Sequence, residues 1–247
     1  GMRRKFMAWI MSIMMIATMM PTMAFAEGES GGTTVSPAHT KTIKKNEDGT
    51  YTLKLDVKGA VSSTSAKPKV DLVIIADVSG SMNKEMGGWG NTRLSSLQTS
   101  AKSLTSALLD NNNVDAKIAL VKYSGNNDRG DQTYNDASVV TQWTDAKNTI
   151  NSGIDSLKAD GGTNCQAGLY EARTKVLNSA RSDAQKIVIF MSDGEPTFYY
   201  DSNGKTMGAG SADGDGYDWR GNIINPGSCS NAAYTEAEKI TDIDAFY

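Results

Sequence analysis

Residues 70–81 have the sequence VDLVIIADVSGS, in which a run of apolar β-formers, Val70–Ala76, is followed at once by a carboxylate and two hydroxyls. A short, continuous apolar run predicts a strand that is buried on both faces, as in a parallel sheet covered by helices. Polar residues at the carboxyl end of such a strand occupy the edge where an open α/β sheet binds its ligands. This stretch therefore predicts both the fold class and the position of a site.

Two further segments carry polar side chains that belong with this one. A second apolar run, Lys186–Met191, is followed by SDGEP at residues 192–196, and GGTN stands earlier, at residues 161–164. In a doubly wound sheet the strand before residue 192 can lie beside the strand before residue 77, so that their carboxylates meet. The candidate ligands of one metal ion are Asp77, Ser79, Ser81, Thr163 and Asp193.

The chemistry of these five candidates favours a hard cation. Each side chain offers oxygen, and no His or Cys lies among them. Such ligands suit Mg²⁺ or Mn²⁺, suit Ca²⁺ less well, and do not favour zinc or copper. Two carboxylates balance the charge of one divalent cation. The remaining ligands are neutral hydroxyls and waters, and a metal that the carboxylates contact through water keeps an electron-poor direct shell. Its open coordination position is then expected to accept an anionic oxygen, for which a Glu or Asp side chain of a partner is the natural candidate.

The rest of the chain alternates between strand and helix patterns, which predicts an α/β fold with a doubly wound, mostly parallel sheet and helices on both faces. The third strand follows directly on the second and is predicted to be an antiparallel edge. The predicted strands are Val70–Ala76, Ala116–Tyr123, Ser138–Trp143 and Lys186–Met191. The predicted helices are Arg93–Leu109, Ala146–Leu157, Gln166–Ala180 and Asn231–Ile243.

The first 26 residues have the pattern of a secretory signal peptide. A basic segment, Arg3-Arg4-Lys5, precedes the apolar run Phe6–Met20, and Ala24-Phe25-Ala26 matches a cleavage site. A transmembrane anchor is the alternative, but the apolar run is shorter than the ~20 residues that a span needs. Gly1, before the natural Met2, reads as a cloning scar or an odd gene start. We expect an exported mature chain that contains no membrane span.

Two regions follow this leader. Residues 27–68 are predicted to be a flexible N-terminal region, except for a strand near residues 50–58, where apolar and polar residues alternate. Residues 69–247 are predicted to form the α/β domain. Because Ala245-Phe246-Tyr247 reads as the opening of another strand, we expect this domain to be truncated at its C-terminus, which would expose a sheet edge.

The charge balance argues against two classes of partner. The 247 residues carry a formal net charge of −3. Loss of the leader removes three basic residues and no acidic one, which leaves 22 basic residues against 28 acidic ones, a net charge of −6. Neither nucleic acid nor an anionic membrane is attracted by such a surface.

The two cysteines and the single histidine limit the chemistry that the chain can support. Cys165 and Cys229 are predicted on the same rim of the domain, so an exported chain could join them in a disulfide or keep two buried or free thiols. His39 is the only histidine and lies in the N-terminal region. Its position leaves no credible Ser-His-Asp triad.

From about Lys69 to Tyr247, the chain resembles von Willebrand factor A (vWA) domains that carry a metal-ion-dependent adhesion site. The family pattern, DxSxS, then T, then D, is matched by the five candidate ligands named above. The resemblance implies that both serines bind the metal directly and that Asp77 acts through water. It also implies that Thr163 and Asp193 exchange direct and water-mediated roles as the site switches.

A second resemblance concerns the whole arrangement. The leader, the strand sequence DGTYTL at residues 48–53 and a Ser-rich linker, Ser62–Lys67, are similar to those of surface proteins of Gram-positive bacteria, in which an A domain lies at the tip of a pilus or a wall-anchored stalk. It implies a secreted or cell-surface protein, anchored to the wall through a C-terminal region that this chain lacks. The implied partner is a protein, for example a host extracellular-matrix or surface protein.

Other functions stay open on the sequence alone. A metal-dependent hydrolase would need a general base, for which Glu195 is the only neighbouring candidate, and we expect no enzyme. A structural pilus or assembly domain would use the metal only for stability. The stretch Phe198–Cys229 is predicted to be an insertion loop or a lid without regular structure. Its acidic residues predict either a calcium loop or a solvated loop: Asp201, Asp213, Asp215 and Asp218. Its aromatic residues are predicted to be either ligand anchors or groups that pack the loop onto the domain: Tyr199, Tyr200, Tyr217 and Trp219.

Overall fold

The computed structural model describes residues 38–45, 51–58, 66–87, 90–126, 132–208, 216–217, 223–224 and 226–247. The predicted leader, residues 1–26, lies outside this range, as do residues 27–37 and 59–65. The described residues fall into two compact units, of which the second spans Ala66–Ala245. Within the described part of the chain, no helix combines the length and apolar character that a membrane crossing requires.

The first unit contains a two-stranded antiparallel hairpin, β1 (Ala38–Lys45) and β2 (Tyr51–Lys58), in which Ala38 pairs with Lys58 and Lys45 with Tyr51. Strand β2 covers the range in which the alternating pattern predicts a strand. Its partner β1, which includes His39, lies in a stretch for which no strand was predicted.

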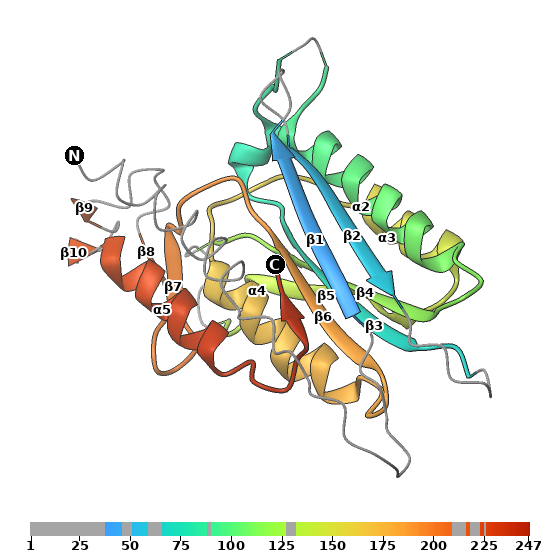
Figure 1. Cartoon of the computed structure of the whole chain (residues 1–247). Helices are drawn as coiled ribbons and strands as arrows, with labels where there is room; N and C mark the ends of the chain where they lie inside the picture. The colour runs from blue at the N-terminus through green and yellow to red at the C-terminus, as the bar shows by residue number, and fades with distance from the viewer. Residues whose placement is uncertain are drawn as a thin grey trace. The chain divides into compact units, whose positions relative to one another are not determined.

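The second unit is built on a five-stranded sheet with the order β11-β6-β3-β4-β5 (Figure 1). Strands β4 and β6 both run parallel to the central strand β3, and β5 runs antiparallel to β4 at one edge. The predicted mostly parallel sheet and its antiparallel edge strand are therefore confirmed. The strands are β3 (Lys69–Asp77), β4 (Asp115–Tyr123), β5 (Ala137–Thr144), β6 (Gln185–Met191) and β11 (Ala245–Phe246).

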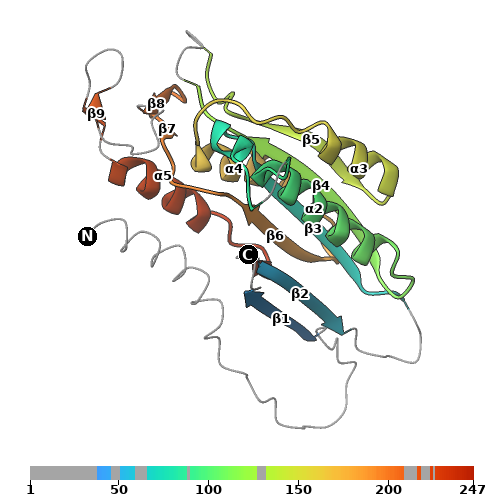
Figure 2. The same ribbon diagram turned by 90° about the horizontal axis from the view of Figure 1, so that it is seen from above.

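Helices cover both faces of this sheet (Figures 1 and 2). A Cβ atom added at Gly153 in α3 would lie 3.5 Å from the Leu120 side chain, and one added at Gly168 in α4 would lie 2.6 Å from the Tyr123 ring. Leu120 and Tyr123 are three residues apart on β4, so they point to opposite faces. The helices are α2 (Arg93–Leu109), α3 (Lys147–Asp155), α4 (Cys165–Glu171) and α5 (Pro226–Glu238).

Two predicted helices differ from those observed. The helix predicted over Gln166–Ala180 is α4 followed by a π turn, Ala172–Val176, and a 3₁₀ turn, Leu177–Ser179. The Val176 carbonyl there accepts a hydrogen bond from Trp143 Nε1 on β5 at 3.0 Å, a tertiary contact that periodicity does not reveal. The helix predicted over Asn231–Ile243 is α5, which begins five residues earlier, since Pro226 suits the first helical position, and ends five residues earlier, at Glu238.

The stretch Phe198–Cys229 is not the irregular loop that its composition predicts. It contains a hairpin of β7 (Phe198–Tyr200) and β8 (Thr206–Gly208), a second short pair of β9 (Gly216–Tyr217) and β10 (Ile223–Ile224), and the first turn of α5. Between β7 and β8, Gly204 adopts a left-handed conformation with φ 80°, and the Asp201 N–H donates to the Lys205 carbonyl. The aromatic β-formers and this turn explain the first hairpin.

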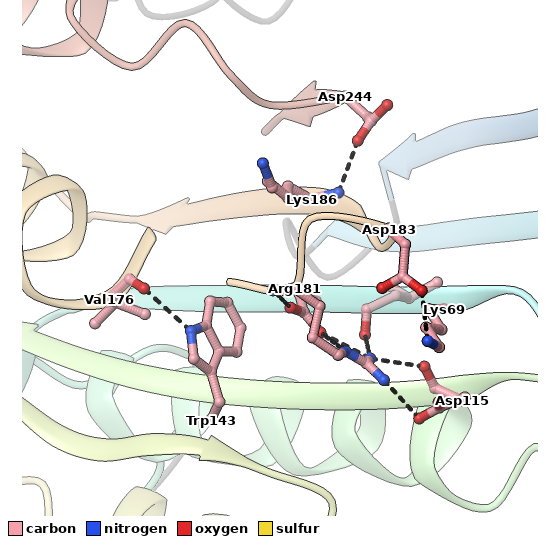
Figure 3. A network of polar contacts seen from close by, with 10 residues as sticks. Lys69, Asp115, Trp143, Val176, Arg181, Asp183, Lys186 and Asp244 are labelled. Atoms are coloured by element: carbon pink, nitrogen blue, oxygen red, sulfur yellow. Dashed lines mark hydrogen bonds and ion pairs between the residues drawn. The ribbon is translucent and has the colours of Figure 1, made fainter. Parts of the chain in front are cut away.

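A half-buried arginine clamps the end of the sheet that lies away from the predicted site (Figure 3). Arg181 donates through its backbone N–H and its Nε to the two carboxylate oxygens of Asp71, at 2.7 and 2.8 Å. Its Nη1 lies 2.8 Å from an oxygen of Asp115, and its Nη2 donates to the Asp115 carbonyl. Asp71 belongs to β3 and is fully buried, and Asp115 begins β4. One side chain therefore joins two neighbouring strands to the segment that precedes β6.

A buried carboxylate holds the other end together. Asp136 is 3% exposed, and its Oδ1 accepts from the Asn126 N–H at 3.1 Å. Its Oδ2 accepts from Asn164 Nδ2 at 2.9 Å and from the Thr206 hydroxyl at 2.6 Å. Its own N–H donates to the Tyr200 hydroxyl. Asp136 thus fixes the β7–β8 hairpin against the loop that precedes α4.

The change Arg181→Met is expected to lower the free energy of unfolding by about 3–5 kcal/mol, because it leaves the buried Asp71 carboxylate without its counter-ion. Urea unfolding followed by circular dichroism measures this loss. Lys147→Met is the matched control, since Lys147 pairs with Asp110 at the surface and should contribute under about 1 kcal/mol. Equal losses in the two variants would contradict the role given to Arg181.

The change Asp136→Asn is expected to cost about 2–3 kcal/mol, because an amide NH₂ would face the donors Asn164 and Thr206 that now share one carboxylate oxygen. Limited proteolysis should also cut the β7–β8 hairpin faster. Asp145→Asn, at an exposed position, is the control and should leave both measurements unchanged. An Asp136→Asn protein as stable as the control would show that the carboxylate charge is not needed.

Candidate metal centre

The chain turns sharply after β3, and the turn gathers the first three candidate ligands. The Ser79 N–H donates to Asp77 Oδ1 at 2.8 Å, and the Ser79 and Ser81 hydroxyl oxygens lie 3.0 Å apart. A short 3₁₀ helix, η1 (Gly80–Asn83), continues from there. Asp77 and Ser79 are fully buried. The alternate spacing of these residues therefore brings the three side chains to one side of the turn.

The parallel pairing of β6 with β3 brings the fourth candidate to this turn. Asp193 Oδ1 accepts from the Ser81 hydroxyl at 2.8 Å. From the neighbouring position, the Ser192 hydroxyl donates to Asp77 Oδ2, also at 2.8 Å. The two aspartates are thus linked through two serines. Ser192 was given no role from the sequence, although its position one residue past a buried strand was a usable signal.

Thr163 lies in a loop that is fastened beside the turn. The Gly80 N–H donates to the Gly161 carbonyl, and the Asp160 N–H donates to the Val78 carbonyl, both at 2.8 Å. Thr163 is buried, but among the described residues no hydrogen bond joins its hydroxyl to the other four candidates. The structure brings Thr163 to the rim and not into the hydrogen-bonded chain.

The residue after Thr163 has a structural role. Asn164 caps α4, since its Oδ1 accepts from the Ala167 N–H at 3.1 Å. Its backbone N–H donates to the Ser124 carbonyl at the end of β4, at 2.9 Å. The cap and this strand contact together fix where α4 begins, and so they fix the height of Thr163 above the sheet.

Burial raises the pKa of Asp77 above its usual value, and the nearby carboxylate of Asp193 raises it slightly further. Hydrogen bonds from Ser79 and Ser192 act in the opposite direction and lower this pKa. A cation in contact with these side chains would favour the ionised form of Asp77. The electrostatics are therefore those of a buried acidic site that gains from a positive charge.

Arg93 supplies a positive charge that sequence reasoning missed. Its Nη1 lies 2.6 Å from Asp193 Oδ2. Arg93 is the first residue of α2, and its N–H donates to the Lys84 carbonyl, just beyond η1. No short motif links Arg93 to the turn, because the contact depends on how the chain returns between residues 84 and 93.

The oxygens fit a small, hard cation. Magnesium binds oxygen at about 2.0–2.1 Å in octahedral geometry, so two adjacent ligands lie about 2.9 Å apart. The hydroxyls of Ser79 and Ser81 are 3.0 Å apart, and Ser81 and Asp193 are 2.8 Å apart. In the seven-coordinate geometry that Ca²⁺ often takes, adjacent oxygens are equally close, so the spacing is compatible with each of these hard cations. Over the described ranges, no three His, Cys, Asp or Glu residues form a cluster that could hold a metal ion.

The residues behind the alternative readings lie as follows. Glu195 is exposed, and within the described ranges no hydrogen bond joins it to the four linked side chains. Asp201 Oδ1 accepts from the Asn203 and Lys205 N–H groups in the β7–β8 turn. The positions 213, 215, 218 and 219 lie outside the described residues, and Tyr217 is described only as part of β9.

Tyr200 packs the hairpin onto the domain. Its ring meets that of Tyr134 edge-on, with 5.1 Å between centroids, and Tyr134 stacks on Tyr170 of α4 at 4.7 Å. For Tyr200, the structure therefore favours the packing role over that of a ligand anchor. Tyr199, its neighbour on β7, is half-buried.

Of the two states left open for the cysteines, the structure has free thiols. Cys165 begins α4 and Cys229 lies in the first turn of α5, not in a loop. Both are buried and unpaired with each other. Burial raises the pKa of Cys229 to about 11 and that of Cys165 further still. Both thiols therefore stay protonated and are poor nucleophiles at neutral pH.

Comparison with solved structures gives the same fold. The pilus adhesin SpaC from Lactobacillus rhamnosus GG is 24% identical with a TM-score of 0.50, over 84% of this chain and 28% of that one. The minor pilin PilB from Streptococcus sanguinis is 16% identical with a TM-score of 0.51, over 82% of this chain and 63% of that one. At these identities the likeness concerns the fold alone.

A third similar structure is the vWF domain of the type V pili tip protein Mfa5 from Porphyromonas gingivalis. It is 27% identical with a TM-score of 0.44, and the match covers 55% of this chain and 41% of that one. The present chain thus spans less than half of the Mfa5 and SpaC chains. Among curated proteins, none matches the sequence significantly.

A sequence profile gives the family itself. The von Willebrand factor type A domain profile matches residues 72–195, just over half of the chain. This range begins in β3 and ends just past Asp193, so it contains all five candidate ligands together with α2, α3 and α4. On the profile match, and with the sheet order that β3, β4 and β6 display, the chain belongs to the von Willebrand factor type A domain family.

Proposed function

We propose that this domain is an extracellular recognition module that binds an acidic group of a protein ligand through Mg²⁺ or Mn²⁺. The observation that carries the proposal is the continuous chain of oxygens from Ser79 through Ser81 to Asp193, with spacings that adjacent ligands of one small cation would have. The cation would be held by Asp77, Ser79, Ser81, Thr163 and Asp193. When bound, it would supply a Lewis-acidic position for a carboxylate oxygen.

The hydrogen bonds at the site support different roles for its two carboxylates. Both oxygens of Asp77 already accept protein hydrogen bonds, from the Ser79 N–H and the Ser192 hydroxyl. Asp77 is therefore suited to act through a water molecule, while it orients the turn. Asp193 Oδ1 accepts directly from the Ser81 hydroxyl. Thr163 lies beside these residues at the rim, in a loop whose position depends on the α4 cap.

Two further observations support recognition over catalysis. Glu195, the candidate general base, is exposed and makes no hydrogen bond to the linked side chains among the described residues. The solved structures with the same fold include a protein named as a pilus adhesin and one named as a minor pilin. We infer that the chain is displayed at the cell surface, exported by the leader predicted at residues 1–26.

Ser81→Ala is expected to weaken Mn²⁺ binding by at least about 10-fold, because it removes the hydroxyl that lies between Ser79 and Asp193. Electron paramagnetic resonance of free Mn²⁺, titrated against the full chain, measures the dissociation constant. Ser103→Ala, at an exposed position on α2, is the matched control and should bind as the wild type does. Unchanged Mn²⁺ affinity in Ser81→Ala and in Asp77→Ala would refute the metal site.

Capture of extracellular-matrix proteins by the immobilised chain is expected to need Mg²⁺, and to be lost with EDTA and with Asp193→Ala. The same Mg²⁺ should also stabilise the fold, by about 2.7 kcal/mol at a concentration 100-fold above its dissociation constant. Surface plasmon resonance and thermal unfolding measure the two effects. Stabilisation without any metal-dependent capture would favour the alternative, a structural assembly domain.

A further inference from the structure

The carboxylate of Asp193 is divided between two partners. Its Oδ1 accepts from the Ser81 hydroxyl at 2.8 Å, on the side of the candidate metal ligands. Its Oδ2 lies 2.6 Å from Nη1 of Arg93. The Asp193 side chain is 9% exposed, whereas that of Arg93 is 34% exposed. One oxygen is therefore turned to the site, and the other holds a guanidinium that reaches the surface of the same rim.

The backbone fixes Arg93 at this place. After η1, the chain goes out and returns through an isolated antiparallel bridge between Glu85 and Thr92. The Met86 N–H donates to the Asn91 carbonyl at 2.7 Å, and the Arg93 N–H donates to the Lys84 carbonyl at 3.0 Å. Arg93 then begins α2, which Thr92 caps through its side chain. A side chain on a capped helix is better positioned for recognition than one on a free loop.

Arg93 changes the charge of the filled site. A divalent cation with Asp77 and Asp193 alone would be neutral. With the guanidinium included, the same group carries one surplus positive charge. That surplus repels the cation and attracts an anion, and both effects are strong where the groups are partly shielded from water. Arg93 therefore works against metal affinity and in favour of an acidic ligand.

The guanidinium also has donors to offer. Nη1 is engaged by Asp193, and in the described part of the chain no hydrogen bond is formed by Nε or Nη2. A guanidinium presents its N–H groups as a planar fork that matches a carboxylate. A lysine at this position would bring the charge without the fork.

Building on the proposed function, we propose that Arg93 is a second cationic contact for the ligand, so that a carboxylate is bound by the metal and the guanidinium together. The ligand class is an exposed Glu or Asp side chain of a protein. The role of Arg93 is one of specificity, because it selects for an acidic group and lowers the affinity for the bare cation.

The test uses the full chain and measures two affinities that should change in opposite directions in Arg93→Gln. Mn²⁺ alone, titrated by electron paramagnetic resonance, should bind about 3–10-fold more tightly, because a neighbouring positive charge is removed. A terminally blocked fluorescent peptide with one glutamate, measured by anisotropy in saturating Mg²⁺, should bind about 10-fold more weakly. The same peptide with glutamine sets the background.

Two further variants show whether the effects are specific to the Arg93 guanidinium. Arg93→Lys keeps the charge, so its Mn²⁺ affinity should stay near that of the wild type, while the loss of the fork should still weaken peptide binding. Lys102→Gln removes another positive charge from α2, one that pairs with Asp155 of α3, and should change neither affinity. Urea unfolding of each variant shows that the comparison is made between folded proteins.

The outcomes separate this inference from the proposal on which it rests. If Asp77→Ala binds Mn²⁺ as the wild type does, the proposed metal site itself fails. If the metal site holds but Arg93→Gln leaves both affinities unchanged, or weakens Mn²⁺ binding, Arg93 only supports the fold and the inference is overturned. A wild-type chain that does not distinguish the glutamate peptide from the glutamine peptide overturns it as well.

Discussion

The parallel pairing of β6 with β3 is the constraint on which the site depends. These strands are distant in sequence, but both end at the same edge of the sheet, in the register that pairs Ala76 with Met191. The residues that follow the two strands therefore form direct hydrogen bonds, from the Ser81 hydroxyl to Asp193 and from the Ser192 hydroxyl to Asp77. Because helices cover both faces of β3, its residues from Val70 to Ala76 are almost wholly buried, and a shift of register would break the core as well as the site.

Much of this could be predicted from residue patterns. The apolar runs before Asp77 and Asp193 predict two buried parallel strands, as observed. Past the ends of these strands, Ser81 donates to Asp193 and Ser192 donates to Asp77, while the shared metal ion stays a prediction. The observed bounds of α2 are those that its pattern predicts, because Thr92 caps the helix and its apolar face is regular. These elements depend on residues that are neighbours in the sequence, so the sequence alone was sufficient to predict them.

The parts that sequence missed depend on contacts between distant segments. Arg93 meets Asp193 only because the chain folds back after η1. The end of α4 is reshaped into a π turn where Trp143 of another strand binds the Val176 carbonyl. The β7–β8 hairpin is held by Asp136, a residue without any motif around it. In each case a side chain satisfies a group that lies far away along the chain, which no local pattern encodes.

If the domain acts as the proposed recognition module, the Arg181 clamp has a consequence for how it would carry a pulling force. A pull between a partner bound at the site and the chain that enters at Lys69 would run along β3. It would load the hydrogen bonds of β3 to β4 and β6 in shear and all together, and it would not open them one after another. Peeling would start at the far end of β3. There Arg181 ties Asp71 to Asp115 and so reinforces the point where such a strand would first give way.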